Sequence, residues 1–286
     1  MDVFHDLIER ALREDLSDPD GSIPSGDHSS LASIPADLEH QAYAVAKAEG
    51  VVAGIDIART VLHRVDSDLE PEMLVQDGDR VATSDLLFRV RGRARSILRA
   101  ERLVLNILQR MSGIATLTRR YVDAVEGTGA IILDTRKTTP GFRAFEKAAV
   151  VIGGGRNHRM GLYDMVMLKD NHIDFCGGIE KAIEATNAYL DERGFRIPIE
   201  IETRSLAEVD EVLRVGGVTR IMLDNFQPRD VRTAVERIDH RYETEVSGGI
   251  TLETVRAYAE CGPDFISSGS LTHSYRSLDI SLKAVK

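Results

Sequence analysis

The chain contains no tryptophan, and aromatic residues make up only 5% of its 286 residues. Because 43% of the residues are nevertheless hydrophobic, the core must be mostly aliphatic and suits one large or two moderate domains. No apolar run approaches the length needed to cross a membrane. The first sixteen residues have the spacing of an amphipathic helix and not the pattern of a signal peptide.

Cysteine and positive charge are also scarce. Cys176 and Cys261 lie far apart and neither has a CxxC partner, which argues against a disulfide framework and a zinc site and favours a cytoplasmic location. The chain has 36 Lys and Arg residues against 46 Asp and Glu residues, for a formal net charge of -10. This balance argues against binding to nucleic acid or to an anionic membrane surface.

The first third of the chain mixes helical and strand patterns without a regular rhythm, as α+β domains do. Helical spacing is present at 2–16 and 55–65, and a long helix is predicted over 97–125, whereas 17–30 reads as a loop. Short strands are predicted within 41–52 and at 73–75, 80–82 and 86–90.

From residue 130 onward, short apolar segments alternate with helical patterns. Near-continuous apolar strands joined by helices predict a parallel sheet. A polar or charged residue follows each of these strands, which favours a β/α barrel over a doubly wound sheet, and no GxGxxG motif supports a dinucleotide-binding fold. The predicted strands are 131–133, 165–168, 197–201, 221–223, 242–246 and 265–266.

A positively charged segment stands out in this acidic chain: residues 136 to 170 contain seven basic and three acidic side chains. Its cations follow different strands, so they should converge on one barrel mouth and form a pocket for a polyanionic small molecule. The alternative interpretation is that these cations form only surface salt bridges. The three glycines Gly153–Gly155 argue against it, because they indicate that the main chain closely approaches another group. The cations are Arg136, Lys137, His158, Arg159 and Lys169.

Two further groups of strand-end residues point to the same mouth. Glu202 and Asp224 end successive strands, so they suit a divalent metal, ribose hydroxyls or acid–base chemistry, or they neutralise the nearby cations. Ser247-Gly248-Gly249 and Ser268-Gly269-Ser270 follow the last two strands. Small residues before a helix expose main-chain N–H groups, which predicts a phosphate site.

Several motifs in this order resemble the quinolinate phosphoribosyltransferase family, over nearly the whole chain. They are Glu101–Asn106, Ser112–Thr116, Asp134–Gly141, Asn157–Arg159, Leu168–His172 and Leu223–Asn225. The resemblance implies transfer of phosphoribosyl from phosphoribosyl pyrophosphate to quinolinate with decarboxylation. The products are nicotinate mononucleotide, pyrophosphate and CO2, magnesium is required, and the reaction is a step of NAD biosynthesis.

The resemblance also implies a domain organisation. It predicts an N-terminal α/β sandwich over 1–112 and an incomplete, seven-stranded parallel β/α barrel over 113–270, with a tail, 271–286, that packs with the first domain. It further implies a homodimer or a higher oligomer, in which the N-terminal domain of one subunit covers the barrel mouth of the other.

Site residues carried over by motif follow the same division. Arg136, His158, Arg159 and Lys169 would bind quinolinate, with Arg102 contributed across the dimer interface. Lys137, Glu202 and Asp224 would be the catalytic residues: Lys137 would contact phosphoribosyl pyrophosphate, and Glu202 and Asp224 would hold its ribose and Mg2+. The 5-phosphate would lie on Ser247, Gly248, Gly249, Ser268 and Gly269.

The sequence departs from the family pattern in two places. Residues 17–25 form an apparent insertion away from the motifs above. The interval between Glu202 and Asp224 is one residue longer than expected, so Glu200, on the same face of its strand, is an alternative to Glu202. Three other functions stay open: a related transferase with a different acceptor base, a Schiff-base lyase using Lys169, and a non-catalytic anion-binding protein.

Overall fold

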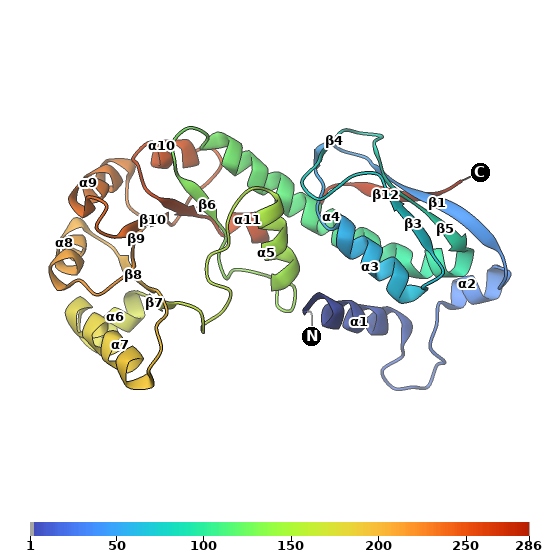
Figure 1. Ribbon diagram of the computed structural model, residues 1–286, viewed down its shortest axis with the longest axis horizontal. Coiled ribbons are helices and arrows are strands. Elements are labelled where there is room, and N and C mark those ends of the chain that lie inside the picture. Colours follow the sequence, from blue (N-terminus) through green and yellow to red (C-terminus); the bar gives the residue numbers. More distant parts are fainter. Residues whose placement is uncertain (1–2, 286) are drawn as a thin grey trace. The chain divides into compact units, whose positions relative to one another are not determined.

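The computed structural model describes residues 3–285 and divides the chain into two compact units (Figure 1). The first unit comprises Met1–Arg119, Thr138–Gly154 and Ser274–Lys286, and the second, here called the barrel unit, comprises Arg120–Lys137 and Gly155–His273. The predicted boundary after residue 112 therefore lies close to the first break. The sequence did not indicate that residues 138–154 group with the first unit.

A four-stranded antiparallel sheet organises the first unit. Its strand order is β12 (Ile280–Ala284), β1 (Glu39–Ala46), β5 (Leu86–Arg93) and β3 (Glu70–Met73), and β2 (Gly50–Val51) pairs separately with β4 (Arg80–Val81). The tail strand β12 runs along β1, with Leu282 opposite Ala44. Strand β1 enters the core along its length: residues 39–41 are exposed, whereas residues 44–46 are all buried.

Helices complete the first unit. They are α1 (Val3–Leu16), α2 (His28–Ser33), α3 (Ile55–Val65), α4 (Ala94–Ala124) and α5 (Arg143–Ile152). Helix α2 interrupts the predicted loop because the Asp27 carboxylate accepts the main-chain N–H of Ser30 and caps the helix. Helix α5 belongs to this unit because it packs on α1, where the rings of Phe4 and Phe145 lie 5.2 Å apart.

Asp66, which follows α3, has a carboxylate surrounded by several hydrogen-bond donors. Its buried carboxylate accepts two bonds from Arg93, of 2.7 and 2.8 Å, and one of 2.6 Å from the Ser96 hydroxyl. Arg93 holds the pKa of this carboxyl well below its ordinary value, and Ser96 adds to the effect, although burial acts in the opposite direction.

We therefore expect Asp66→Asn to lower the free energy of unfolding by about 1–3 kcal/mol at pH 7. A depressed carboxyl pKa stabilises the fold above the ordinary value of 3.8, and this contribution is lost as the pH falls below that value. The difference between variant and wild type should be constant near neutrality and shrink in acid, as measured by urea unfolding. Asp56→Asn, which breaks an exposed pair with Arg59, is the control and should change stability by less than about 0.5 kcal/mol.

The barrel unit contains a six-stranded parallel sheet, confirming the α/β class. The strand order is β6 (Ile131–Leu133), β11 (Phe265–Ser267), β10 (Glu243–Ser247), β9 (Arg220–Asp224), β8 (Ile199–Thr203) and β7 (Val166–Leu168). Six strands are described where the family resemblance implied seven. The seventh position, beside β6, holds only an isolated parallel bridge between Leu133 and Arg156. The chain pairs there for a single residue before it turns toward His158.

Helices connect the barrel strands and cover the outside of the sheet (Figure 1). They are α6 (Asp170–Cys176), α7 (Ile179–Arg193), α8 (Leu206–Val215), α9 (Pro228–Ile238), α10 (Val255–Ala259) and α11 (Ser270–His273). All strands run parallel, so their carboxyl ends meet at one rim. None of the helices in residues 3–285 is long and apolar enough to span a membrane.

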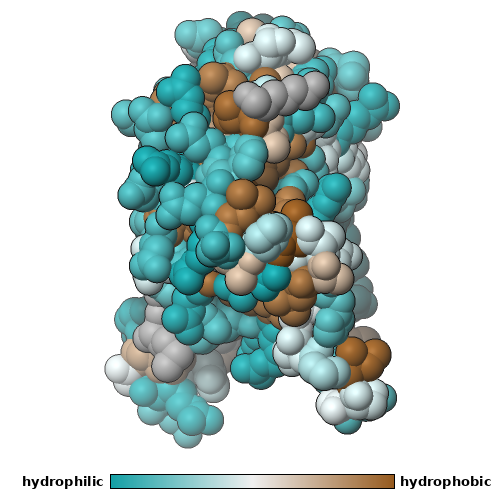
Figure 2. All heavy atoms as spheres, turned by 90° about the vertical axis from the view of Figure 1, so that its right-hand side faces the viewer, coloured by the Kyte–Doolittle hydropathy of each residue, from teal (hydrophilic) through white to brown (hydrophobic). Residues whose placement is uncertain are grey.

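The surface is mostly hydrophilic, with apolar side chains emerging in patches on the face shown in Figure 2. Within the first unit, one apolar groove lies between α4 and strand β12. Leu38 and Leu98, which line it, are 40% and 42% exposed. Ile34, Glu101 and Leu282 are among the other residues of this groove.

Candidate active site

A cavity of about 660 Å³ opens at the carboxyl ends of the barrel strands. It lies entirely within the barrel unit, and ten of the sequence-predicted site residues line it. Arg102, Ser268 and Gly269 do not belong to this lining. The ten are Arg136, Lys137, His158, Arg159, Lys169, Glu202, Asp224, Ser247, Gly248 and Gly249.

Two arginines form the cationic part of the cavity. Arg136 follows β6, and its Nε is buried with no hydrogen-bond partner among residues 3–285. Arg159 donates Nη1 to the Met165 carbonyl at 3.1 Å. Burial and the neighbouring Arg136 charge both lower the pKa of Arg159, against the opposite influence of Glu200 and Asp164. Two crowded guanidiniums with an unsatisfied donor make this part of the cavity a binding site for an anion.

Two carboxylates form the acidic part. Glu202 is the penultimate residue of β8 and Asp224 the last residue of β9, and Lys169 Nζ lies 3.3 Å from a Glu202 oxygen. Burial raises the pKa of both carboxyls. The Asp224 charge also raises that of Glu202, while Lys169 opposes the shift. Half-buried carboxyl groups with a raised pKa are suited to bind a cation or hydroxyl groups of a ligand.

Glu200 has a different environment from Glu202, although both side chains are on the same face of β8. Glu200 lies deeper, is 0% exposed and does not line the cavity, whereas Glu202 does. The Nε2 atom of His158 lies 2.8 Å from Glu200 and 3.4 Å from Glu245 of β10. Of the two glutamates left open by the sequence, Glu202 is the one that faces a ligand.

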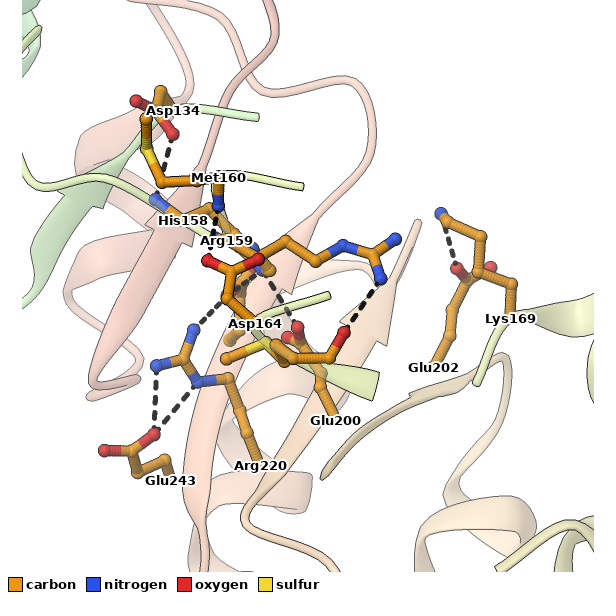
Figure 3. A network of polar contacts seen from close by, with 12 residues as sticks. Asp134, His158, Arg159, Met160, Asp164, Lys169, Glu200, Glu202, Arg220 and Glu243 are labelled. Carbon is orange, nitrogen blue, oxygen red and sulfur yellow. Dashed lines mark hydrogen bonds and ion pairs between the residues drawn. The ribbon is translucent and has the colours of Figure 1, made fainter. Parts of the chain in front are cut away.

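Arg220 and Glu245 are site residues that the sequence reasoning missed. Arg220 donates Nη1 to Glu245 at 2.8 Å and grips Glu243 with Nε and Nη2 at 3.0 and 2.9 Å. Figure 3 shows Arg220 and Glu200 close to His158, whose side chain lines the cavity. The available signals were Glu245, inside the predicted strand 242–246, and Arg220, directly before the predicted strand 221–223.

The loop after β10 supplies the small residues. Gly248 has φ +91°, and a Cβ atom there would lie 2.3 Å from the Asn225 side-chain oxygen and 2.9 Å from the Asn225 main-chain nitrogen. Ser268 donates its hydroxyl to the Ile250 carbonyl at 3.2 Å and thus braces this loop from below. Next to it, a Cβ atom on Gly269 would lie 2.8 Å from Lys137 Cδ, so Gly269 leaves room for that lysine.

Gly248→Ala is expected to be far more disruptive than Gly249→Ala. Both glycines have positive φ angles, which costs alanine about 1–2 kcal/mol, but only Gly248 lacks space for a methyl group. We expect Gly248→Ala to lower the free energy of unfolding by about 2–4 kcal/mol and Gly249→Ala by about 1 kcal/mol. Chemical denaturation of both variants measures the difference. Equal losses would show that the contact with Asn225 relaxes at no cost.

Arg102 is exposed on α4, in the first unit, and its predicted role across a subunit interface stays a prediction. Glu101, the preceding residue, lines the apolar groove beside β12. Arg102 therefore follows a residue of the apolar groove that the exposed Leu38 and Leu98 also line.

Two family models match this chain. The model described as "Quinolinate phosphoribosyl transferase, C-terminal domain" matches residues 114–283, and the corresponding N-terminal domain matches residues 27–112. The first match alone covers more than half of the chain. The chain belongs to the quinolinate phosphoribosyl transferase family.

Curated relatives and solved structures agree with this assignment. The chain is 48% identical to "Nicotinate-nucleotide pyrophosphorylase [carboxylating], chloroplastic" of Arabidopsis thaliana, over 97% of this chain and 81% of the relative. It is 42% identical to the carboxylating pyrophosphorylase of Mycobacterium leprae, over 98% and 97%. The crystal structure of NadC from Streptococcus pyogenes superposes with a TM-score of 0.90 at 38% identity, covering 99% and 97%.

Proposed function

We propose that this chain is a phosphoribosyltransferase that joins quinolinate to phosphoribosyl pyrophosphate with loss of CO2, forming nicotinate mononucleotide and pyrophosphate. The observation that carries the proposal is the division of one cavity into a cationic part with an unsatisfied Arg136 donor and an acidic part at Glu202 and Asp224. A pyridine dicarboxylate fits the first part and a sugar phosphate with its metal fits the second. Relatives named for this reaction support it.

The acceptor would bind between Arg136 and Arg159, with Lys169 at the boundary with the acidic part. Planar guanidinium groups bind carboxylates through two parallel hydrogen bonds, and two such groups suit the two carboxylates of quinolinate. Lys169 already pairs with Glu202. An ammonium group held in an ion pair is not the neutral amine that a Schiff base requires, which disfavours the lyase alternative.

Phosphoribosyl pyrophosphate would occupy the acidic part and the small-residue loops. Lys137, which Gly269 accommodates, would contact the pyrophosphate. Ser247, Gly248 and Gly249 end β10 with an open loop whose main-chain N–H groups suit the 5-phosphate, and Gly269 follows the adjacent strand β11.

Glu202 and Asp224 would hold Mg2+ together with the ribose hydroxyls. Their fit to this ion rests on the shared cavity and on the pKa of both carboxyls, which burial raises, because a bound cation with oxygen ligands compensates for the lost solvation. When bound, Mg2+ supplies positive charge that stabilises the departing pyrophosphate.

The residues of the chain then orient a displacement that needs no protein nucleophile. The pyridine nitrogen of the acceptor forms a bond to the ribose carbon as the bond to pyrophosphate breaks, and the arginines keep the two reactants aligned. Charge that develops on the ribose lies near Glu202 and Asp224. The pyridinium then accepts the electron pair of the C–CO2 bond, CO2 leaves, and the ring carbon takes up a proton.

A homodimer would supply Arg102 to the acceptor site of the partner subunit. The exposed leucines beside α4 give such a contact an apolar surface, since patches of this kind on a protein commonly mark an interface. We also propose a cytoplasmic location, based on the similarity to the Mycobacterium leprae relative, whose name gives no organelle. Some plant relatives are named as chloroplastic or mitochondrial proteins.

The reaction is tested by incubating the protein with quinolinate, phosphoribosyl pyrophosphate and Mg2+ and measuring nicotinate mononucleotide and CO2. Nicotinate replaces quinolinate in a parallel assay. Turnover of quinolinate alone supports the proposal and the need for a second carboxylate. Binding of phosphoribosyl pyrophosphate without turnover of either acceptor would overturn it and favour a different base.

A further inference from the structure

A group of charged residues fills the barrel interior where aliphatic side chains are usual. Glu200, Arg220 and Glu245 lie inside β8, β9 and β10, and both glutamates are 0% exposed. Burying charges is expensive, and a buried ion pair is often no more stabilising than apolar residues of similar size. Layers of branched aliphatic residues would fill a barrel at lower cost. The network therefore calls for an explanation other than stability.

The network ends on His158 and holds its ring from several sides. Nε2 faces Glu200 and Glu245 at 2.8 and 3.4 Å, and Nδ1 receives the main-chain N–H of Arg159 at 2.7 Å. The main-chain N–H of His158 itself donates to the buried Asp134, which follows β6, at 2.9 Å. Both ring nitrogens thus have protein partners.

These contacts also hold the main chain of Arg159 in place. Its main-chain N–H is engaged by His158, and its guanidinium is anchored at one nitrogen by the Met165 carbonyl. Arginine otherwise has much rotamer freedom, which binding an anion would have to restrict. A side chain ordered in advance binds more tightly because this entropy is already lost.

We propose that Glu200, Arg220 and Glu245 are positioning residues that act on the acceptor through His158 and Arg159. His158, which lines the cavity, links the network to Arg159 and so limits the freedom of its guanidinium. Arg220 donates to Glu245, and Glu245 contacts the His158 ring. The same ring accepts the main-chain N–H of Arg159. On its other side, Arg220 donates to Glu243 (Figure 3). The identity of the acceptor as quinolinate rests on the proposed function.

The test is a double-mutant cycle on ligand binding. The variant Arg220→Met/Glu245→Gln removes both members of one ion pair, so neither charge is left buried alone. Calorimetry with quinolinate should give a Kd about 10-fold higher than wild type, whereas the Kd of phosphoribosyl pyrophosphate should change by less than about twofold. In an Arg159→Met background the same pair of substitutions should have no further effect on quinolinate.

Additive effects in the two backgrounds would overturn the proposal, because they would mean that the network does not act through Arg159. An unchanged quinolinate Kd in a folded double variant would do the same. If the double variant does not fold, Arg220→Lys replaces it: it keeps a positive charge but loses the fork to Glu243, and should raise the quinolinate Kd about threefold. The control is Arg214→Met/Glu180→Gln, an ion pair on the outer helices with 60% and 48% exposed side chains.

A measurement without ligand separates this inference from the proposed reaction. The Nε–H signal of Arg159, assigned by its loss in Arg159→Lys, should be sharp in NMR spectra of the wild type and broadened in Arg220→Met/Glu245→Gln. If wild type binds no quinolinate but the signal broadens, the proposed acceptor is wrong and the positioning role stands. A signal that is equally sharp in both proteins contradicts the positioning role.

Discussion

Arg136→Ala is expected to lower kcat/KM for quinolinate roughly 30- to 1,000-fold, which corresponds to about 2–4 kcal/mol of transition-state binding. The Arg136 side chain follows β6 into the cavity, and its buried Nε has no partner within residues 3–285. A bound carboxylate would satisfy that donor, so the truncated side chain loses a charge-assisted fork and leaves the carboxylate unpaired. Initial rates at varied quinolinate concentration measure the loss.

Two comparisons sharpen this result. Arg136→Lys keeps the charge but not the planar fork, and it should recover only a small part of the activity. Arg214→Ala removes an arginine from the exposed pair with Glu180 and should leave the rate unchanged. Near-normal turnover by Arg136→Ala would show that the acceptor binds elsewhere.

Glu202→Gln is expected to reduce kcat/KM for phosphoribosyl pyrophosphate by about 10²- to 10³-fold and to raise the Mg2+ concentration that gives half-maximal activity. The substitution keeps the shape of the side chain but removes one of the two carboxylates that share the acidic part of the cavity. Rates measured over a series of Mg2+ concentrations separate a loss of metal binding from a loss of the chemical step.

The same substitution should not destabilise the protein. Burial, with the Asp224 charge adding to it, raises the pKa of Glu202 above its ordinary value, so the folded state holds the ionised form at a cost. The cost is present at neutral pH and disappears as the pH falls through the raised pKa. A neutral amide removes it, so the midpoint of thermal unfolding should be unchanged or higher. Glu236→Gln, on the exposed face of α9, is the control, and normal Mg2+ dependence of Glu202→Gln would exclude the proposed role.

Much of the barrel unit was predictable because its signals are local. An apolar segment that ends at Asp134 or at Lys169 reveals both a strand and the residues at its carboxyl end. Parallel strands then bring such residues to one rim, and for that reason cations and acids far apart in the sequence could be assigned to one cavity. Helix caps gave a weaker signal than the apolar segments did. Asp27 caps α2, but the surrounding residues are typical of a loop, so the helix was not predicted.

The unit boundary was harder to predict because it depends on packing. Helix α5 follows a barrel strand in the sequence, so the alternating pattern assigns it to the barrel. Its Phe145 ring instead packs against Phe4, and its buried Glu146 carboxylate accepts a 3.0 Å bond from Arg110 Nε. Contacts between residues more than thirty positions apart carry no periodic signal in the sequence.

The amino-acid sequence by itself determined the family, the parallel order of strands and helices, and the chemical types gathered at the strand ends. Only the tertiary structure decided that Glu202 faces the cavity while Glu200 is buried beneath it. It also decided that Arg220 lies opposite Glu200 and Glu243 in the strand register and donates to Glu245, which itself contacts His158. The reason is that alternation along one strand defines a face, whereas depth and register depend on neighbouring strands that the sequence does not place.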